Sequence, residues 1–330
     1  MRDVSYTKKR FEGVKTMNRR DLIKLSAGGL AVAALPFNVS AAGLRQLPGA
    51  QRFTVGRTTI TALSDGYVDL INAQTLVGID EDGYEAALAT AGRGAGARQS
   101  DVNAYLVDNG RQKILVDAGG SKSFIQTLGG VPDALRYAGY QPEDITHILM
   151  SHLHPDHVSG VLDETNNALY VNAEMIIHER EMNFWVTSDT YAHLPQLAPF
   201  FEIARHVATA YDGRIRTYTG TDVGLAGIVA EPMFGHTPGH VGFVIEDSGE
   251  HVLVTSDLVL HSVIQLMYPD VSVAFDTDPD AATAVRQRVL GRAAQSQERL
   301  IGMHFPFPGL GRIECANDGF RWVAEEWQFL

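Results

Sequence analysis

The sequence predicts an α/β protein in which sheets and helices are stacked in layers. Short runs of apolar and β-branched residues occur in pairs typical of hairpins, and segments with helical spacing separate these pairs. Acidic residues and histidines recur at the points where such runs end. This pattern favours a layered sandwich with a polar site along one edge of its sheets.

The composition is that of an ordinary globular protein. The 330 residues are 45% hydrophobic and 20% charged, which suits one large domain or two small ones. The formal net charge is −12, and because residues 1–42 hold eight basic and three acidic residues, the remainder carries −17. Such an acidic body argues against nucleic acid as a partner. Cys315 is the only cysteine, which excludes an intrachain disulfide and a thiolate metal cluster.

Residues 1–42 have the pattern of an export signal. Arg19, Arg20 and Lys24 precede an uncharged apolar run over 25–37, and small residues follow it. The run is shorter than the roughly 20 residues that cross a bilayer, so we expect no stable membrane insertion. Paired arginines in this setting are typical of a twin-arginine signal. We therefore expect cleavage near Ala41 or Ala42 and a periplasmic or secreted protein.

The first half of the remaining chain is predicted to contain two strand pairs. Gly56 joins the first pair, and Asn109-Gly110 gives the second pair a strong hairpin signal. The four strands are residues 53–55, 58–63, 104–107 and 113–116, with the turn at Ser64 closing the second. Residues 81–100 are expected to be loop with some helix, and helical spacing of apolar residues predicts a helix over 124–138.

The second half is predicted to alternate strands and helices. Asp278 and Pro279 are a plausible N-cap and first turn for its long C-terminal helix. The expected strands are residues 145–150, 175–177, 228–233, 241–245, 252–255 and 300–303. The expected helices are residues 179–186 and 279–298.

The strongest chemical signal follows the strand at 145–150. His152, His154, Asp156 and His157 lie within six residues of one another. Imidazole nitrogen and carboxylate oxygen are ligands that Zn²⁺ prefers. Alternation along an extended backbone puts His152 and His154 on one side. The turn at Pro155 directs Asp156 and His157 elsewhere, where they could reach a second ion, so the sequence predicts a metal site.

Four further residues share the character of this motif. Asp117, His236, Asp257 and His304 each come immediately after a strand-like run. The other histidines are predicted to occupy strand, helix or surface positions: His147, His178, His193, His206, His251 and His261. A supporting role for His240 is left open, because it is near the site in sequence but is expected to point away along the next strand.

These motifs together resemble the metallo-β-lactamase superfamily. They are His-x-His-x-Asp-His at 152–157, His236 within Gly-His-Thr-Pro-Gly-His, Asp257 and His304. Within the superfamily the chain is most similar to the secreted methyl parathion hydrolase group and its lactonase relatives, over essentially everything after residue 50. The stretches that carry this closer likeness are residues 60–66, 138–143, 183–185, 257–260 and 305–309. The resemblance implies one domain over 43–330 with an αββα sandwich, in which helices flank two mixed sheets.

The resemblance also implies two divalent metal ions, with Zn²⁺ as the expected metal. The implied ligands are His152, His154 and His236 for the first ion, Asp156, His157 and His304 for the second, and Asp257 for both. Asp117 would orient a ligand imidazole. Three protein ligands per ion and a shared carboxylate would leave room for a bridging hydroxide and a substrate.

A hydrolase follows from this resemblance, with the hydroxide attacking a carbonyl or phosphoryl centre and Asp257 able to accept its proton. Five residues match or neighbour the group's apolar pocket: Phe124, Trp185, Phe200, Phe201 and Leu260. Such a pocket suits a small neutral aryl ester, lactone or phosphotriester. We expect lactone or ester opening as the physiological reaction, phosphotriesterase activity as a promiscuous one, and a homodimer.

Several alternatives remain open. Acyl-homoserine lactonase activity is the main one, because those relatives share every ligand. A true β-lactamase is disfavoured by His157, a glyoxalase-type thioesterase by Trp185 and residues 305–309, and a nuclease by the acidic body. A non-catalytic metal-binding protein would bind metals and turn over no ester, lactone or phosphotriester.

Overall fold

The computed structural model describes residues 47–93, 99–189, 194 and 197–326. The predicted export signal at 1–42 lies outside these residues. That signal, its cleavage site and the periplasmic or secreted location therefore stay predictions, as do the domain boundary at 43 and the homodimer. In the part of the chain that is described, none of the helices combines the length and the apolar character needed to cross a membrane.

Seven strands form the first sheet, in the order β1-β2-β4-β5-β6-β7-β8. They are β1 (Ala50–Val55), β2 (Thr58–Val68), β4 (Ser100–Asp108), β5 (Lys113–Val116), β6 (His147–Leu149), β7 (Glu174–His178) and β8 (Ile215–Tyr218). The strands from β1 to β5 pair antiparallel, and those from β5 to β8 pair parallel. The sheet is therefore mixed, and both predicted hairpins of the first half are confirmed.

Six strands form the second sheet, in the order β15-β14-β13-β11-β10-β9. They are β9 (Ile228–Pro232), β10 (Val241–Asp247), β11 (Glu250–Val254), β13 (Leu300–Ile301), β14 (Leu310–Ala316) and β15 (Gly319–Ala324). Only β11 and β13 pair parallel within this sheet. A separate ribbon joins β3 (Leu76–Val77) to β12 (Ser272–Val273).

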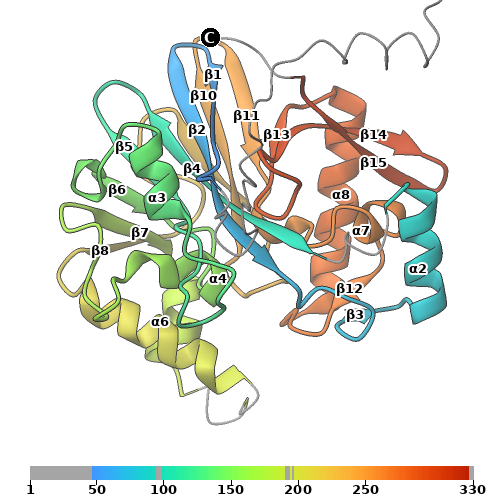
Figure 1. Ribbon diagram of the computed structural model, residues 1–330, viewed down its shortest axis with the longest axis horizontal. Helices are drawn as coiled ribbons and strands as arrows, with labels where there is room; N and C mark the ends of the chain where they lie inside the picture. Colours follow the sequence, from blue (N-terminus) through green and yellow to red (C-terminus); the bar gives the residue numbers. More distant parts are fainter. Residues whose placement is uncertain (1–46, 94–98, 190–193, 195–196, 327–330) are drawn as a thin grey trace, which may run out of the picture. The chain divides into compact units, whose positions relative to one another are not determined.

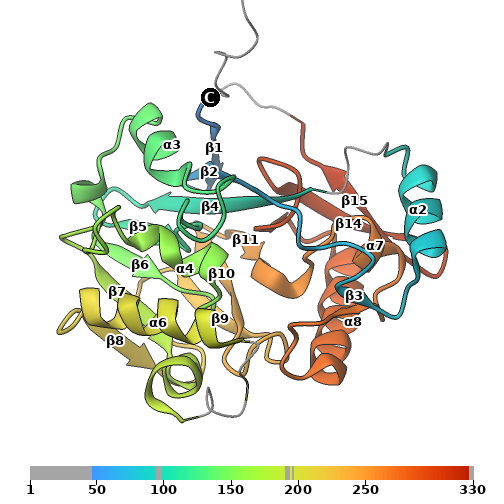
Figure 2. The same cartoon turned by 60° about the horizontal axis from the view of Figure 1, so that its bottom comes forward.

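Helices cover the outer faces of the two sheets, as the αββα prediction requires (Figure 1). Over the first sheet lie α3 (Val131–Tyr137), α4 (Pro155–Val158) and α6 (Ala198–Ala210), and Figure 2 shows α6 running across β7 and β8. Against the second sheet lies α8 (Pro279–Ser296). Shorter helices are α2 (Glu81–Thr90), α5 (Glu179–Glu181), η5 (Met182–Thr187), η8 (Ser256–Leu258) and α7 (Ile264–Met267). Between the sheets is an apolar core that includes Ile60 and Phe243.

The prediction of a helix over 124–138 is wrong in its first half, because α3 begins only at Val131. Gly129 has a φ of +91°, which breaks a helix. The Asp65 carboxylate accepts the backbone N–H groups of Gly129 and Val131 at 3.1 and 3.0 Å, and fixes the preceding segment as a loop. The expected strand end at Ser64 is also wrong, because β2 continues through a β-bulge to Val68.

The other helix predictions are confirmed in outline. Residues 179–186 are helical, but the turn of α5 widens into the π-helix η5. The long C-terminal helix begins after Asp278, whose side chain accepts the backbone N–H of Ala281. The predicted elements therefore occur in the predicted order, with errors at the bulge in β2 and the start of α3. The sequence did not predict seven further elements that the structure contains: β3, α6, β8, α7, β12, β14 and β15.

Candidate metal centre

The predicted ligands lie at one edge of the sandwich, because each follows the C-terminal end of a strand. In the first sheet, Asp117 follows β5 and the segment 152–157 follows β6. In the second sheet, His236, Asp257 and His304 follow β9, β11 and β13, which all run in the same direction. The two halves of the chain therefore deliver their polar side chains to one place.

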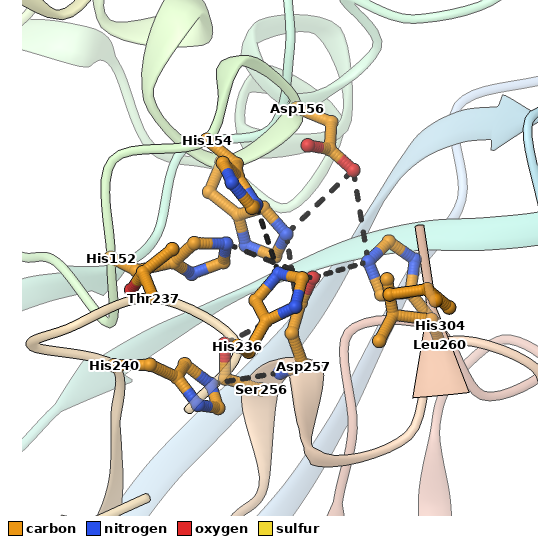
Figure 3. Close-up of polar contacts among 12 residues, drawn as sticks. His152, His154, Asp156, His236, Thr237, His240, Ser256, Asp257, Leu260 and His304 are labelled. Carbon is orange, nitrogen blue, oxygen red and sulfur yellow. Dashed lines mark hydrogen bonds and ion pairs between the residues drawn. The ribbon is translucent and has the colours of Figure 1, made fainter. Parts of the chain in front are cut away.

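These side chains form two clusters of potential metal ligands. Within each cluster the candidate ligand atoms lie within 4.8 Å of one another. The first cluster is His152, His154, His236 and Asp257, and the second is Asp156, His157 and His304. Asp257 reaches both clusters. Its carboxylate oxygens lie 3.3 Å from His236 Nε2 and 3.3 Å from His304 Nε2 (Figure 3). They also lie 3.0 Å from His157 Nε2.

Three of the rings use their Nδ1 nitrogen to bind an oxygen outside the clusters. The pairs are His157 with Asp117 Oδ2 at 2.9 Å, His236 with Asp276 Oδ1 at 2.7 Å, and His304 with the Asp101 carbonyl at 2.8 Å. Carboxylate and carbonyl oxygens accept only, so Nδ1 carries the hydrogen in each ring. In the neutral ring, the Nε2 lone pair then points toward Asp257.

This arrangement fits divalent metal ions. Nitrogen lone pairs that face a carboxylate repel it unless a cation lies between them. The Nε2 atoms of His152 and His304 are buried without a hydrogen-bond partner, although buried polar atoms are nearly always paired. A divalent cation would satisfy the imidazoles and Asp257 together, and this donor set suits Zn²⁺.

The pKa values of the histidines also favour a cation beside Asp257. Burial lowers the pKa of His236, but Asp257 and Asp276 outweigh that effect and raise the pKa to about 9. Asp257 likewise outweighs burial and raises the pKa of His157 and His304. Positive charge is therefore stabilised beside Asp257. By contrast, burial and neighbouring imidazoles hold the pKa of His152 and His154 well below its usual value, which keeps them neutral.

Asp117 lies where a carboxylate orients an imidazole. Besides His157, it accepts the backbone N–H of Ser151 at 2.8 Å and the Ser151 hydroxyl at 2.6 Å. The Ser256 hydroxyl donates to Ser151 Oγ at 2.7 Å, which links this network to the residue before Asp257. Asp117 thus ties the loop after β6 to η8, and a catalytic role for it stays a prediction.

Three supporting residues were missed or left open by the sequence interpretation. Asp276 holds His236, and Glu181 binds the loops around the first cluster. His240 accepts the backbone N–H of Asp257 through Nε2 at 3.2 Å, so its ring faces the site. The sequence gives only an indirect signal for Asp276. A buried His236 needs a hydrogen-bond acceptor for its Nδ1–H, but the sequence does not show which of the chain's carboxylates is that acceptor.

The five predicted pocket residues separate into two groups. Phe124 and Phe200 are half-buried, form an edge-to-face pair with centroids 5.9 Å apart, and Phe200 lies 5.5 Å from the His154 ring. Trp185, Phe201 and Leu260 are only 0%, 1% and 3% exposed. Trp185 contacts the His154 ring from within the core at 5.4 Å. Phe200 and Trp185 thus contact the His154 ring, Leu260 lies beside His304 (Figure 3), and Phe124 reaches the site only through Phe200. A substrate role for all five stays a prediction.

Fold and site together define an αββα protein with a histidine–carboxylate metal centre. The model of the metallo-beta-lactamase superfamily matches residues 97–304. The chain belongs to this superfamily, which confirms the resemblance drawn from the sequence. The closer likeness to the methyl parathion hydrolase group stays a prediction.

Solved structures and curated proteins give more specific similarities. A crystal structure of the hydrolase AbOPH, in the beta lactamase superfamily, is 28% identical with a TM-score of 0.80. AidC, a dizinc quorum-quenching lactonase in complex with a product, is 28% identical with a TM-score of 0.79. Each match covers 86% of this chain and 100% of the other. An N-acyl homoserine lactonase from Bacillus sp is 26% identical over 176 residues, which are 46% of this chain and 62% of that protein. The matches span only part of the curated relatives, 61% and 62% of the length of two of them and 37% of a third.

Proposed function

We propose that this protein is a metal-dependent hydrolase that opens lactones and related neutral esters, with N-acyl homoserine lactones as the substrate class. The observation that carries the proposal is the convergence of five histidines and two aspartates on one sheet edge, with the Nε2 lone pairs of three of the rings directed at Asp257. Similarity to a dizinc quorum-quenching lactonase over that protein's whole length supports the substrate class.

We assign the two clusters to two divalent ions, with Zn²⁺ as the metal. The first cluster would hold one ion through His152, His154 and His236, the second would hold the other through Asp156, His157 and His304, and Asp257 would contact both. When bound, such ions acidify water and polarise an ester carbonyl. The Asp156 side chain is the most exposed of these ligands at 18%, so substrate and water would enter on its side.

Side chains of the site also bind the metal ions and the substrate. Burial would raise the pKa of Asp257, but in the metal-free site the positive charge of protonated His157 and His304 outweighs burial and holds that pKa well below its usual value. Asp257 therefore stays ionised and serves as an anionic ligand. Phe200, which lies beside His154, and Phe124, which packs edge-to-face against Phe200, offer aromatic surface for the apolar part of the substrate.

A second candidate is hydrolysis of aryl phosphotriesters, such as methyl parathion. The half-buried edge-to-face pair of Phe124 and Phe200 favours it, because an aryl leaving group packs well against aromatic edges and faces. The same two-cluster centre would serve both reactions, so only relative rates separate them.

The deciding measurement is kcat/KM for an acyl-homoserine lactone, dihydrocoumarin and methyl parathion, with metal content determined in the same sample. We expect a lactone to lead by about tenfold or more, equal to about 1.4 kcal/mol of transition-state preference. A lead for methyl parathion would replace the lactonase proposal with the second candidate. Two bound metals without turnover of any of the three would overturn both and support the metal-binding alternative.

A further inference from the structure

Glu181 is a buried carboxylate that lies behind the first cluster. Its side chain is 0% exposed and accepts four hydrogen bonds, two on each oxygen. Oε1 accepts from the Thr237 hydroxyl at 2.5 Å and the Gly239 backbone N–H at 2.7 Å. Oε2 accepts from the Leu153 backbone N–H at 3.0 Å and the Trp185 indole N–H at 2.9 Å.

Two of the four donors, Leu153 and Thr237, are adjacent in sequence to histidines of the first cluster. Leu153 lies between His152 and His154, and Thr237 directly follows His236. One carboxylate therefore connects the loop after β6 to the loop after β9, which come from different sheets. Among the described hydrogen bonds of Glu181, none goes to Asp156, His157 or His304.

We propose that Glu181 is a positioning residue that holds His152, His154 and His236 in register, and thereby sets the affinity of the first metal ion in preference to the second. This inference rests on the metal centre of the proposed function. Glu181 also fixes Trp185, whose ring lies 5.4 Å from that of His154, so the aromatic wall and the ligand loops share one anchor.

The chemistry of the contacts requires a carboxylate at this position. All four partners are donors, and an ionised carboxylate offers only acceptors. A glutamine would place its NH₂ group against two donors, whichever way its amide is turned. Each buried donor left without an acceptor costs about 1–3 kcal/mol, so the loops would shift to find other partners.

Gly239 provides an independent sign that the loop is pressed against Glu181. A Cβ atom added at Gly239 would lie 2.7 Å from the Glu181 backbone nitrogen, closer than any real contact. This approach brings the Gly239 N–H to the carboxylate. It also explains the second glycine of Gly-His-Thr-Pro-Gly-His, which the metal ligands themselves do not require.

The test compares Glu181→Gln with Glu179→Gln, an identical change at an exposed residue of the same helix. Zn²⁺ affinity is measured by competition with a chromophoric chelator, without substrate. An Asp156→Ala background removes a ligand of the second cluster, so the remaining ion reports the first. We expect Glu181→Gln to lower the Zn²⁺ affinity of the first cluster by roughly 10–100-fold. Glu179→Gln should leave that affinity unchanged. Trp185 emission should shift in the Glu181 variant alone.

Two outcomes overturn the inference: unchanged Zn²⁺ affinity with only a lower melting temperature, or equal loss at both ions in the otherwise wild-type chain. Should Glu181→Gln fail to fold, Thr237→Val decides, because it removes one of the four hydrogen bonds and keeps the carboxylate. A smaller loss selective for the first ion supports the inference, and no loss overturns it. If the wild-type chain itself binds no Zn²⁺, the result contradicts the proposed metal-dependent function rather than the role of Glu181.

Discussion

Two neighbouring regions of the molecule bury histidines to a similar extent but treat the ring nitrogens differently. At the metal centre, His152 and His304 are 0% and 1% exposed, and their Nε2 atoms lack hydrogen-bond partners. His261 is 4% exposed and lies four residues after Asp257. Its Nδ1 accepts the backbone N–H groups of Val263 and Ile264, both at 3.3 Å, and its Nε2 lies 3.4 Å from the Tyr84 hydroxyl.

The difference shows that burial of a histidine does not by itself mark a metal ligand. The His261 ring uses both nitrogens to connect the first turn of α7 to α2, so neither is left for a cation. Burial lowers its pKa to about 4, whereas carboxylates raise that of His236 to about 9. What separates the two regions is the presence of carboxylates and the direction of the lone pairs. Substitutions at the metal centre should therefore change metal binding, whereas substitution of His261 should change stability and leave metal binding intact.

The largest effect is expected from Asp257→Ala, because this carboxylate contacts both clusters. Loss of metal should reduce kcat/KM by at least about 1,000-fold, more than the roughly 10–100-fold typical of residues that only orient ligands. Metal content by mass spectrometry and lactone hydrolysis provide the measurement. Asp247→Ala, at the opposite end of the β10–β11 hairpin, is the control and should keep both metals. An Asp257→Ala protein with full metal content and near-normal rates would disprove the shared-carboxylate assignment.

The second prediction concerns His261 and the pH dependence of stability. Its folded pKa of about 4 lies below the ordinary value of 6.5, so the unfolded state binds more protons between these values. Stability from this group is therefore fully present above about pH 6.5 and is lost as the pH falls toward 4, by about 3 kcal/mol in total.

His261→Asn should flatten that dependence, because asparagine can still accept the N–H groups of α7 but does not titrate. Urea unfolding of the metal-free wild type and variant at pH 4.5, 5.5 and 6.5 measures the difference. Zn²⁺ binding at pH 7.5 should be the same in both. Parallel stability curves would refute the pKa argument, and a loss of Zn²⁺ would refute the division between the two regions.

The smallest effect is expected from Asp117→Asn. If the asparagine amide faced His157, it would donate to Nδ1, which would move the ring hydrogen to Nε2 and remove the lone pair that faces Asp257. We expect roughly a 10–100-fold loss of metal affinity, mainly at the second cluster. Chelator competition measures it, with Asp133→Asn on the exposed face of α3 as the control. Equal affinity in both variants would show that Asp117 does not orient His157.

The structural predictions were correct where the local conformation depends on residues close by in sequence. The Asn109-Gly110 hairpin and the Asp278 cap depend on groups within a few positions, and both formed as predicted. The start of α3 was wrong because its boundary depends on Asp65, whose carboxylate binds N–H groups more than 60 residues away in sequence. Helical spacing of Phe124 and Leu128 reflected burial against another core cluster rather than a helix.

The sequence by itself determined the fold class and the candidate ligands, because strand ends and a dense His/Asp motif are local features that spacing reveals. The tertiary structure alone decided which groups hold those ligands: Asp276 on His236, the Asp101 carbonyl on His304, and Glu181 between the two loops. Hydrogen bonds of this kind join segments that lie far apart along the chain. The chain has 39 acidic residues, and the packing of two sheets at one edge selects Asp276 and Glu181 for these positions.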